Sequence, residues 1–118
     1  MSLAHLALVV RDQERSRRFY ETYFGFDAGP SNRLDNGVLF IRDADGFELA
    51  LAEREAPGSM PPFVHFGFRL DGRDRVRALK TRLDQGGVPI FEEEEGPGLW
   101  SFKCRDPDGY LVEVYSTE

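Results

Sequence analysis

The chain has 118 residues, of which 41% are hydrophobic and 31% charged, and its net charge is −6. A chain of this length is expected to form one domain, and its acidic balance argues against binding to nucleic acid or an anionic membrane, which require a basic face. No apolar run approaches the roughly 20 residues that a membrane helix needs. A single cysteine excludes an internal disulfide and fits a cytoplasmic protein.

The first half of the chain predicts one helix among several strands. Residues 3–10 are almost entirely apolar, as in a buried strand. Asp12 is a suitable N-cap for a helix that ends at Phe24, because Gly25 follows as a stop. The remaining segments are a short strand plus a loop in 26–36, strands at 38–42 and 47–52, the turn Asp43–Gly46, and the linker 53–62.

The second half repeats this order of elements. It predicts a strand at 63–70, a helix at 73–85, a strand at 88–92, an acidic loop at 92–98, a strand at 99–104, the turn Asp106–Gly109 and a strand at 110–115. The chain therefore reads as two βαβββ modules, about 3–52 and 63–116, within one domain that spans 1–118. A module of about 50 residues buries little core alone, so the two are expected to share an interior.

The two histidines of the chain occupy matching positions in these modules. His5 lies in the first apolar strand, and His65 lies in the corresponding segment, Val64–Phe68. A lone histidine in a strand is more often a hydrogen-bonded core residue than a ligand. Matching positions in a repeat favour a shared site instead, since related modules would bring the two strands together.

Glu113 is the third candidate of this site. The alternation of a strand places Leu111, Glu113 and Tyr115 on one face. A carboxylate in such apolar surroundings is costly unless it is paired or binds a metal. One reading is a salt bridge with Arg69 or Lys103. The other is a metal site of two imidazoles and one carboxylate, which suits Fe, Mn, Zn, Ni or Co.

These motifs resemble the vicinal oxygen chelate superfamily, which includes glyoxalase I, extradiol dioxygenases, methylmalonyl-CoA epimerase, fosfomycin-resistance enzymes and bleomycin-resistance proteins. The resemblance covers nearly the whole chain and is carried by Leu3–Val10, Phe19-Tyr20, Gly25-Phe26, Val64–Phe68 and Asp106–Glu113. It implies an α+β fold in which two βαβββ modules form an open, curved mixed sheet around a metal cavity. It also implies a homodimer and one divalent metal ion held by His5, His65 and Glu113.

The resemblance further suggests a fourth metal ligand, Glu48, from the last strand of the first module. The internal repeat weakens this assignment. Glu113 stands four residues after Gly109, whereas the residue four after Gly46 is Ala50. Glu48 is therefore a candidate ligand, a candidate general base beside the metal, or a carboxylate near the rim of the cavity.

The expected function is that of a metal-dependent lyase, isomerase or dioxygenase whose small substrate chelates the metal through neighbouring oxygens. Glu48 or Glu113 would act as the base, and Tyr115 as a proton donor or as a wall of the cavity. Lactoylglutathione lyase activity is not expected, because Val9 and Ala52 replace an arginine and an asparagine of glyoxalase I. The alternative is a metal-free small-molecule binding protein of bleomycin-resistance type.

Overall fold

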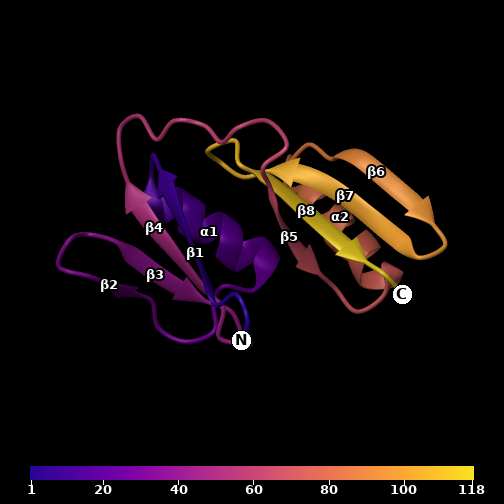
Figure 1. Ribbon diagram of the computed structural model, residues 1–118, viewed down its shortest axis with the longest axis horizontal. Coiled ribbons are helices and arrows are strands. Elements are labelled where there is room, and N and C mark those ends of the chain that lie inside the picture. Colours follow the sequence, from indigo (N-terminus) through magenta and orange to yellow (C-terminus); the bar gives the residue numbers. More distant parts are fainter. The chain divides into compact units, whose positions relative to one another are not determined.

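The computed structural model describes residues 1–118, which divide into two compact units, Met1–Gly58 and Ser59–Glu118. Each unit contains one helix and one four-stranded sheet (Figure 1). The boundary between them falls within the predicted linker 53–62. The predicted βαβββ order is confirmed in both units, and neither helix is long and apolar enough to cross a membrane.

The first unit is built around a mixed sheet. Its elements are β1 (His5–Val10), α1 (Gln13–Phe24), β2 (Asn32–Arg33), β3 (Leu39–Arg42) and β4 (Glu48–Glu53). The strands lie in the order β1-β4-β3-β2, with β1 parallel to β4 and the other pairs antiparallel. The predicted helix ends are confirmed. The side chain of Asp12 accepts a hydrogen bond from the backbone N–H of Arg15, and Gly25 ends α1 in the left-handed region at φ 74°.

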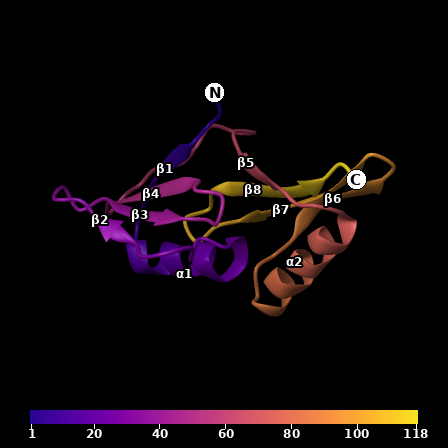
Figure 2. The ribbon, with the colours of Figure 1, turned by 90° about the horizontal axis from the view of Figure 1, so that it is seen from below.

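Alternation along the strands divides this sheet into a core face and an open face. The core face and α1 supply the buried side chains of Leu8, Val10, Phe19, Tyr20, Leu39, Ile41, Leu49 and Leu51. Figure 2 shows α1 covering that face. His5 and Glu48 alternate with these residues along β1 and β4, so they lie on the open face of the sheet.

The second unit has the same plan. Its elements are β5 (Phe66–Arg69), α2 (Arg73–Gln85), β6 (Phe91–Gly96), β7 (Leu99–Arg105) and β8 (Leu111–Ser116), and its strand order is β5-β8-β7-β6. The bounds of α2 match the prediction, and its apolar face joins two strands in a core of Val76, Leu79, Leu83, Phe102, Cys104, Val112 and Val114. Leu111, Glu113 and Tyr115 occupy the alternate, half-buried positions of β8, away from this core.

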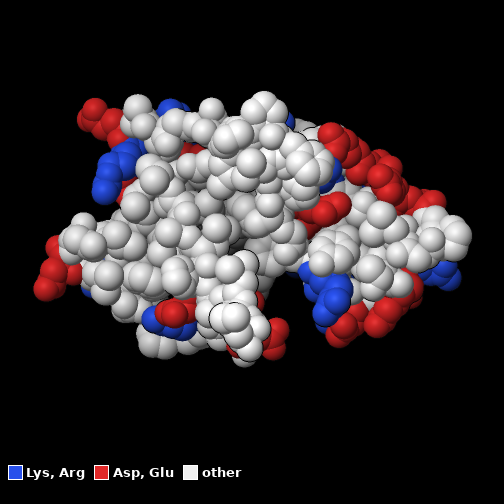
Figure 3. Space-filling view, viewed as in Figure 1, with Lys and Arg blue, Asp and Glu red and all other residues white.

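The prediction of an acidic loop at 92–98 was wrong. Glu92–Glu95 belong to β6, an edge strand that pairs with β7 in an antiparallel arrangement. The four carboxylates are exposed, and Figure 3 shows them as an acidic stripe along this edge. Lys80 forms an ion pair with Glu93, and Lys103 forms one with Glu92. Solvent exposure and the two lysines reduce the repulsion between the neighbouring carboxylates, so a strand is tolerated here. Charge on an edge strand also discourages pairing with other chains.

The two Asp-x-Asp-Gly turns are confirmed and are built alike. The Oδ1 atoms of Asp43 and Asp106 each accept hydrogen bonds from the backbone N–H groups two and four residues later. The N–H groups of Gly46 and Gly109 donate to the carbonyls of the same aspartates. The turns therefore start the last strand of each unit in the same way, which supports the internal alignment of the two modules.

Candidate metal centre

His65 and Glu113 come together in the second unit. His65 precedes β5 by one residue, so the prediction that it lies inside the strand was wrong by one position. Two residues later, Gly67 pairs with Glu113 in the parallel register of β5 and β8. The Nε2 atom of His65 lies 3.6 Å from Oε1 of Glu113, and the two side chains are 20% and 26% exposed. The pair is partly shielded yet accessible, as a ligand pair must be.

The other ring nitrogen of His65 is also engaged. Its Nδ1 atom lies 2.6 Å from the carbonyl oxygen of Phe63. A carbonyl oxygen can only accept a hydrogen bond, so Nδ1 carries a proton, and in the neutral ring Nε2 is left with a lone pair. That lone pair and the carboxylate of Glu113 then face each other as two acceptors. A protonated ring would instead form an ion pair with Glu113.

This geometry fits a divalent metal ion. Metal–nitrogen and metal–oxygen bonds of about 2.0–2.2 Å allow two ligand atoms on one ion to stand up to about 4 Å apart, depending on the angle at the metal. The separation of 3.6 Å between His65 and Glu113 lies within that range. An ion bound between the two acceptors would also remove their mutual repulsion. The hydrogen bond to Nδ1 is the arrangement that metal-binding histidines usually show.

The alternative to a metal site, a salt bridge of Glu113 with Arg69 or Lys103, does not form. Lys103 and Glu113 are cross-strand neighbours in β7 and β8, but Nζ of Lys103 donates a hydrogen bond to Oε2 of Glu92 at 2.6 Å. This hydrogen bond raises the pKa of Lys103 and lowers the pKa of Glu92, and the nearby charge of Glu113 also contributes to the shift at Lys103. The carboxylate of Glu113 therefore remains next to His65, without an ion pair to Lys103.

Glu48 lies on the open face of the first sheet, in a different environment. Its Oε2 atom forms a 2.7 Å ion pair with a terminal nitrogen of Arg42, its cross-strand neighbour. In the register of β1 and β4, Glu48 stands opposite His5, and Ala50 takes the place that Glu113 has in the second sheet. The carboxylate of Glu48 thus already has a partner. The counterpart of Glu113 in the first sheet is Ala50 and not Glu48, as the internal alignment of the sequence indicates.

The remaining predicted residues are placed as follows. His5 is the first residue of β1 and is exposed. Tyr115 is half-buried on the same face of β8 as Glu113. Its Cε1 atom is so close to Gly67 that a Cβ added there would stand 3.3 Å away. Within neither unit do three His, Cys, Asp or Glu side chains gather around one point. The second unit thus supplies two neighbouring ligand candidates and a tyrosine.

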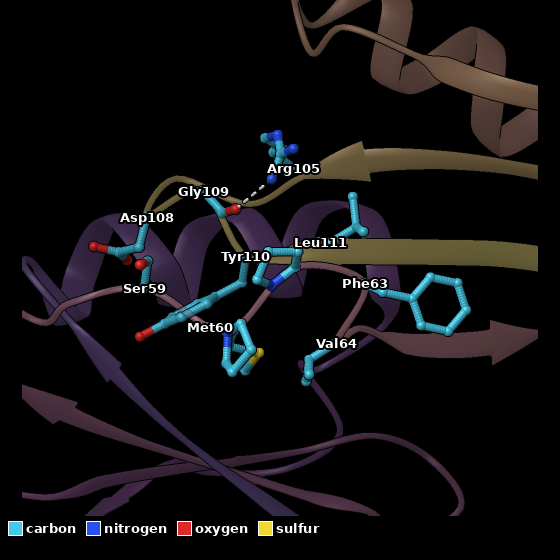
Figure 4. A pocket seen from close by; sticks show the side chains of 11 residues that line it. Ser59, Met60, Phe63, Val64, Arg105, Asp108, Gly109, Tyr110 and Leu111 are labelled. Carbon is cyan, nitrogen blue, oxygen red and sulfur yellow. Dashed lines mark hydrogen bonds between the residues drawn. The ribbon is translucent and has the colours of Figure 1, made fainter.

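A cavity of about 310 Å³ opens in the second unit, next to the segment that leads into His65 (Figure 4). It is lined by Ser59–Val64, Arg105 and Asp108–Leu111. Figure 4 shows the ring of Phe63 turned away from Met60 and Tyr110. Phe63 is not among the predicted site residues, since it contributes a backbone carbonyl, which side-chain patterns do not reveal. Pro61 and Pro62, which precede it, are the one sequence feature that could have indicated a rigid turn at this point.

Comparison with known proteins identifies the family. The family model described as "Glyoxalase/Bleomycin resistance protein/Dioxygenase superfamily" matches residues 2–114. The chain belongs to this superfamily. Membership in the glyoxalase/bleomycin resistance protein/dioxygenase superfamily confirms the resemblance carried by the motifs, and the two mixed sheets with one helix each confirm the predicted fold class.

Several known proteins are similar over almost the whole chain. Glutathione transferase FosA of Serratia marcescens is 30% identical, over 97% of this chain and 79% of its own. The structure of a possible glyoxalase from Bacillus cereus is 30% identical, with a TM-score of 0.81 over 97% of both chains. The fosfomycin resistance protein FosX of Listeria monocytogenes, solved with Mn(II) and sulfate, is 20% identical and has a TM-score of 0.79 over 99% of this chain and 90% of its own. FosX therefore shows the shared fold.

Proposed function

We propose that this chain is a divalent-metal-dependent enzyme whose small substrate chelates the metal through two neighbouring oxygens. The observation that carries the proposal is the 3.6 Å approach of His65 Nε2 to Glu113 Oε1, with Nδ1 of the same ring held by the carbonyl of Phe63. His5 is proposed as the third ligand on sequence grounds. It is the one other histidine, and it stands at the matching position of the repeat.

The donor set limits the choice of metal. Imidazole and carboxylate ligands suit Mn, Fe, Co, Ni and Zn and disfavour soft ions such as Cu(I). FosX of Listeria monocytogenes, which shares the fold, was solved with Mn(II). Mn(II) is accordingly the first metal to test, followed by Fe(II), Co(II), Ni(II) and Zn(II).

The metal and two further side chains have distinct proposed roles. A divalent ion bound there would supply Lewis-acid polarisation of the substrate oxygens. Tyr115, on the same strand face as Glu113, would donate a proton to the substrate. Glu48 is proposed as a proton acceptor rather than a fourth ligand, because its Oε2 atom already forms an ion pair with Arg42.

Metal analysis of the protein purified without added metal tests this proposal. We expect a near-stoichiometric divalent metal in the wild type and its loss in His5→Ala, His65→Ala and Glu113→Ala. Glu94→Ala, which removes an exposed carboxylate of β6, is the control and should keep the metal. Negligible metal in the wild type, unchanged in the three variants, would reject the enzyme proposal.

Glu48→Gln separates the roles of that carboxylate. Retention of the metal with loss of turnover supports a proton acceptor, whereas loss of the metal makes Glu48 a ligand. The substrate screen should combine catechols under air with α-ketoaldehydes and epoxides, each with and without glutathione. Glutathione is included because a relative 30% identical is named a glutathione transferase.

The second candidate function is metal-free binding of a small molecule, as the bleomycin resistance proteins of the superfamily name suggest. One observation favours it. The cavity of about 310 Å³ is lined by neither His65 nor Glu113, so it offers a binding volume that needs no metal. Ligand binding that survives both His65→Ala and removal of metal by a chelator would support this function over the enzyme.

A further inference from the structure

The turn before His65 has an unusual backbone. The N–H of Val64 donates to the carbonyl of Pro61 at 3.2 Å, which closes a four-residue turn. Phe63, the third residue of this turn, has a φ of 74°. Turns with a positive φ at this position ordinarily carry glycine or asparagine there, because bulky side chains rarely adopt it. Phe63 and Glu92 are the two non-glycine residues with positive φ.

Core packing does not explain this conformation. The side chain of Phe63 is 80% exposed, so burial of the ring does not offset the backbone strain. Its ring meets the imidazole of His65 edge to face, with centroids 5.2 Å apart at 87°. The close polar contact of the residue is made by its carbonyl oxygen, 2.6 Å from Nδ1 of His65. Strained backbone that persists without burial is typical of functional sites.

We propose that Phe63 is a positioning residue for the metal centre. The turn holds its carbonyl against Nδ1 of His65, which fixes the Nδ1–H tautomer and the plane of the ring. The lone pair of Nε2 is then directed at Glu113 before a metal arrives. This inference rests on the proposed function, and the left-handed backbone, rather than the phenyl ring, is the part of Phe63 that matters.

Two substitutions separate the backbone from the ring. Phe63→Gly removes the ring but accepts a positive φ freely, whereas Phe63→Val removes the ring and disfavours that φ strongly. We expect titration of the full chain with Mn(II) to show affinity within about threefold of wild type for Phe63→Gly, and a loss of about tenfold or more for Phe63→Val, the usual scale for a lost partner of a metal-binding histidine. Equal affinity in all three proteins, or an equal loss in both variants, would overturn the proposal.

A second measurement does not depend on metal binding. Long-range ¹H–¹⁵N NMR of the metal-free protein at about pH 8.5, above the ordinary imidazole range, reports which nitrogen of a neutral ring is protonated. The chain has two histidines, so His5→Gln assigns the signals of His65. We expect Nδ1–H in wild type and Phe63→Gly, and a mixture of tautomers in Phe63→Val.

The Nε2–H tautomer in wild type would overturn the inference, even if Phe63→Val fails to fold. A wild type that shows the Nδ1–H tautomer but binds none of Mn(II), Fe(II), Co(II), Ni(II) and Zn(II) would instead reject the proposed function. The two failures are therefore distinguishable.

Discussion

Gln13 connects the start of α1 to the sheet of the first unit. Its side chain is almost fully buried, and Nε2 donates to the carbonyls of Leu51 and Gly37, both at 2.7 Å. Gln13→Ala removes both of these short hydrogen bonds, and with them the longer one, at 3.3 Å, that Oε1 accepts from Arg33. At about 0.5–1.5 kcal/mol for each bond, plus the lost packing of the Cγ methylene group, we expect a destabilisation of about 2–3 kcal/mol.

Urea unfolding of the full chain measures this effect. With an m-value of about 1–3 kcal/mol/M for a small protein, the midpoint should fall by roughly 1–2 M while m stays unchanged. Gln85→Ala is the matched control, because Gln85 is exposed at the end of α2. Equal midpoints for Gln13→Ala and Gln85→Ala would refute the assignment of Gln13 as the residue that fixes α1 on the sheet.

Two further predictions concern backbone and thiol. Gly25→Ala should lower the free energy of unfolding by about 1–2 kcal/mol, because Gly25 adopts a φ of 74°. Gly96 has an ordinary φ and open space around its Cα, so Gly96→Ala should change the free energy of unfolding by less than about 0.5 kcal/mol. Thermal unfolding measures both. Burial raises the pKa of Cys104 from 9.0 to about 12. Iodoacetamide at pH 8 should therefore alkylate the native thiol about 1,000-fold more slowly than the unfolded chain. A native thiol that reacts as fast as the unfolded one would contradict the raised pKa. Because the folded state favours the neutral thiol, the contribution of Cys104 to the free energy of unfolding is present below about pH 9 and should be lost as the pH rises from about 9 towards 12.

The helices and turns could be predicted from local residues. Asp12 and Gly25 bound α1 as expected, and the buried spacing of Val76, Leu79 and Leu83 fixed the face of α2. The strand β6 could not be predicted in this way. Its acidic residues disfavour a strand locally, but they pair with Lys80 of α2 and Lys103 of β7, and such contacts between elements override propensity.

The sequence indicated which residues belong to the candidate site, but it did not indicate which contacts they make. Matching positions in the repeat identified the histidines, and the alternation of β8 identified Glu113. The ion pair between Arg42 and Glu48 depends on the register of β3 and β4, which no local pattern specifies. The approach of the Phe63 carbonyl to His65 depends on one backbone dihedral angle.

The most direct test of the central claim is isothermal titration of the intact chain with Mn(II), comparing wild type with Glu113→Gln and Lys103→Gln. The first substitution removes the charged ligand with little change of shape, and the second alters its cross-strand neighbour. The account predicts saturable binding in wild type and Lys103→Gln, and a loss of at least tenfold in Glu113→Gln. Equal affinity for Mn(II) in wild type and Glu113→Gln would contradict it.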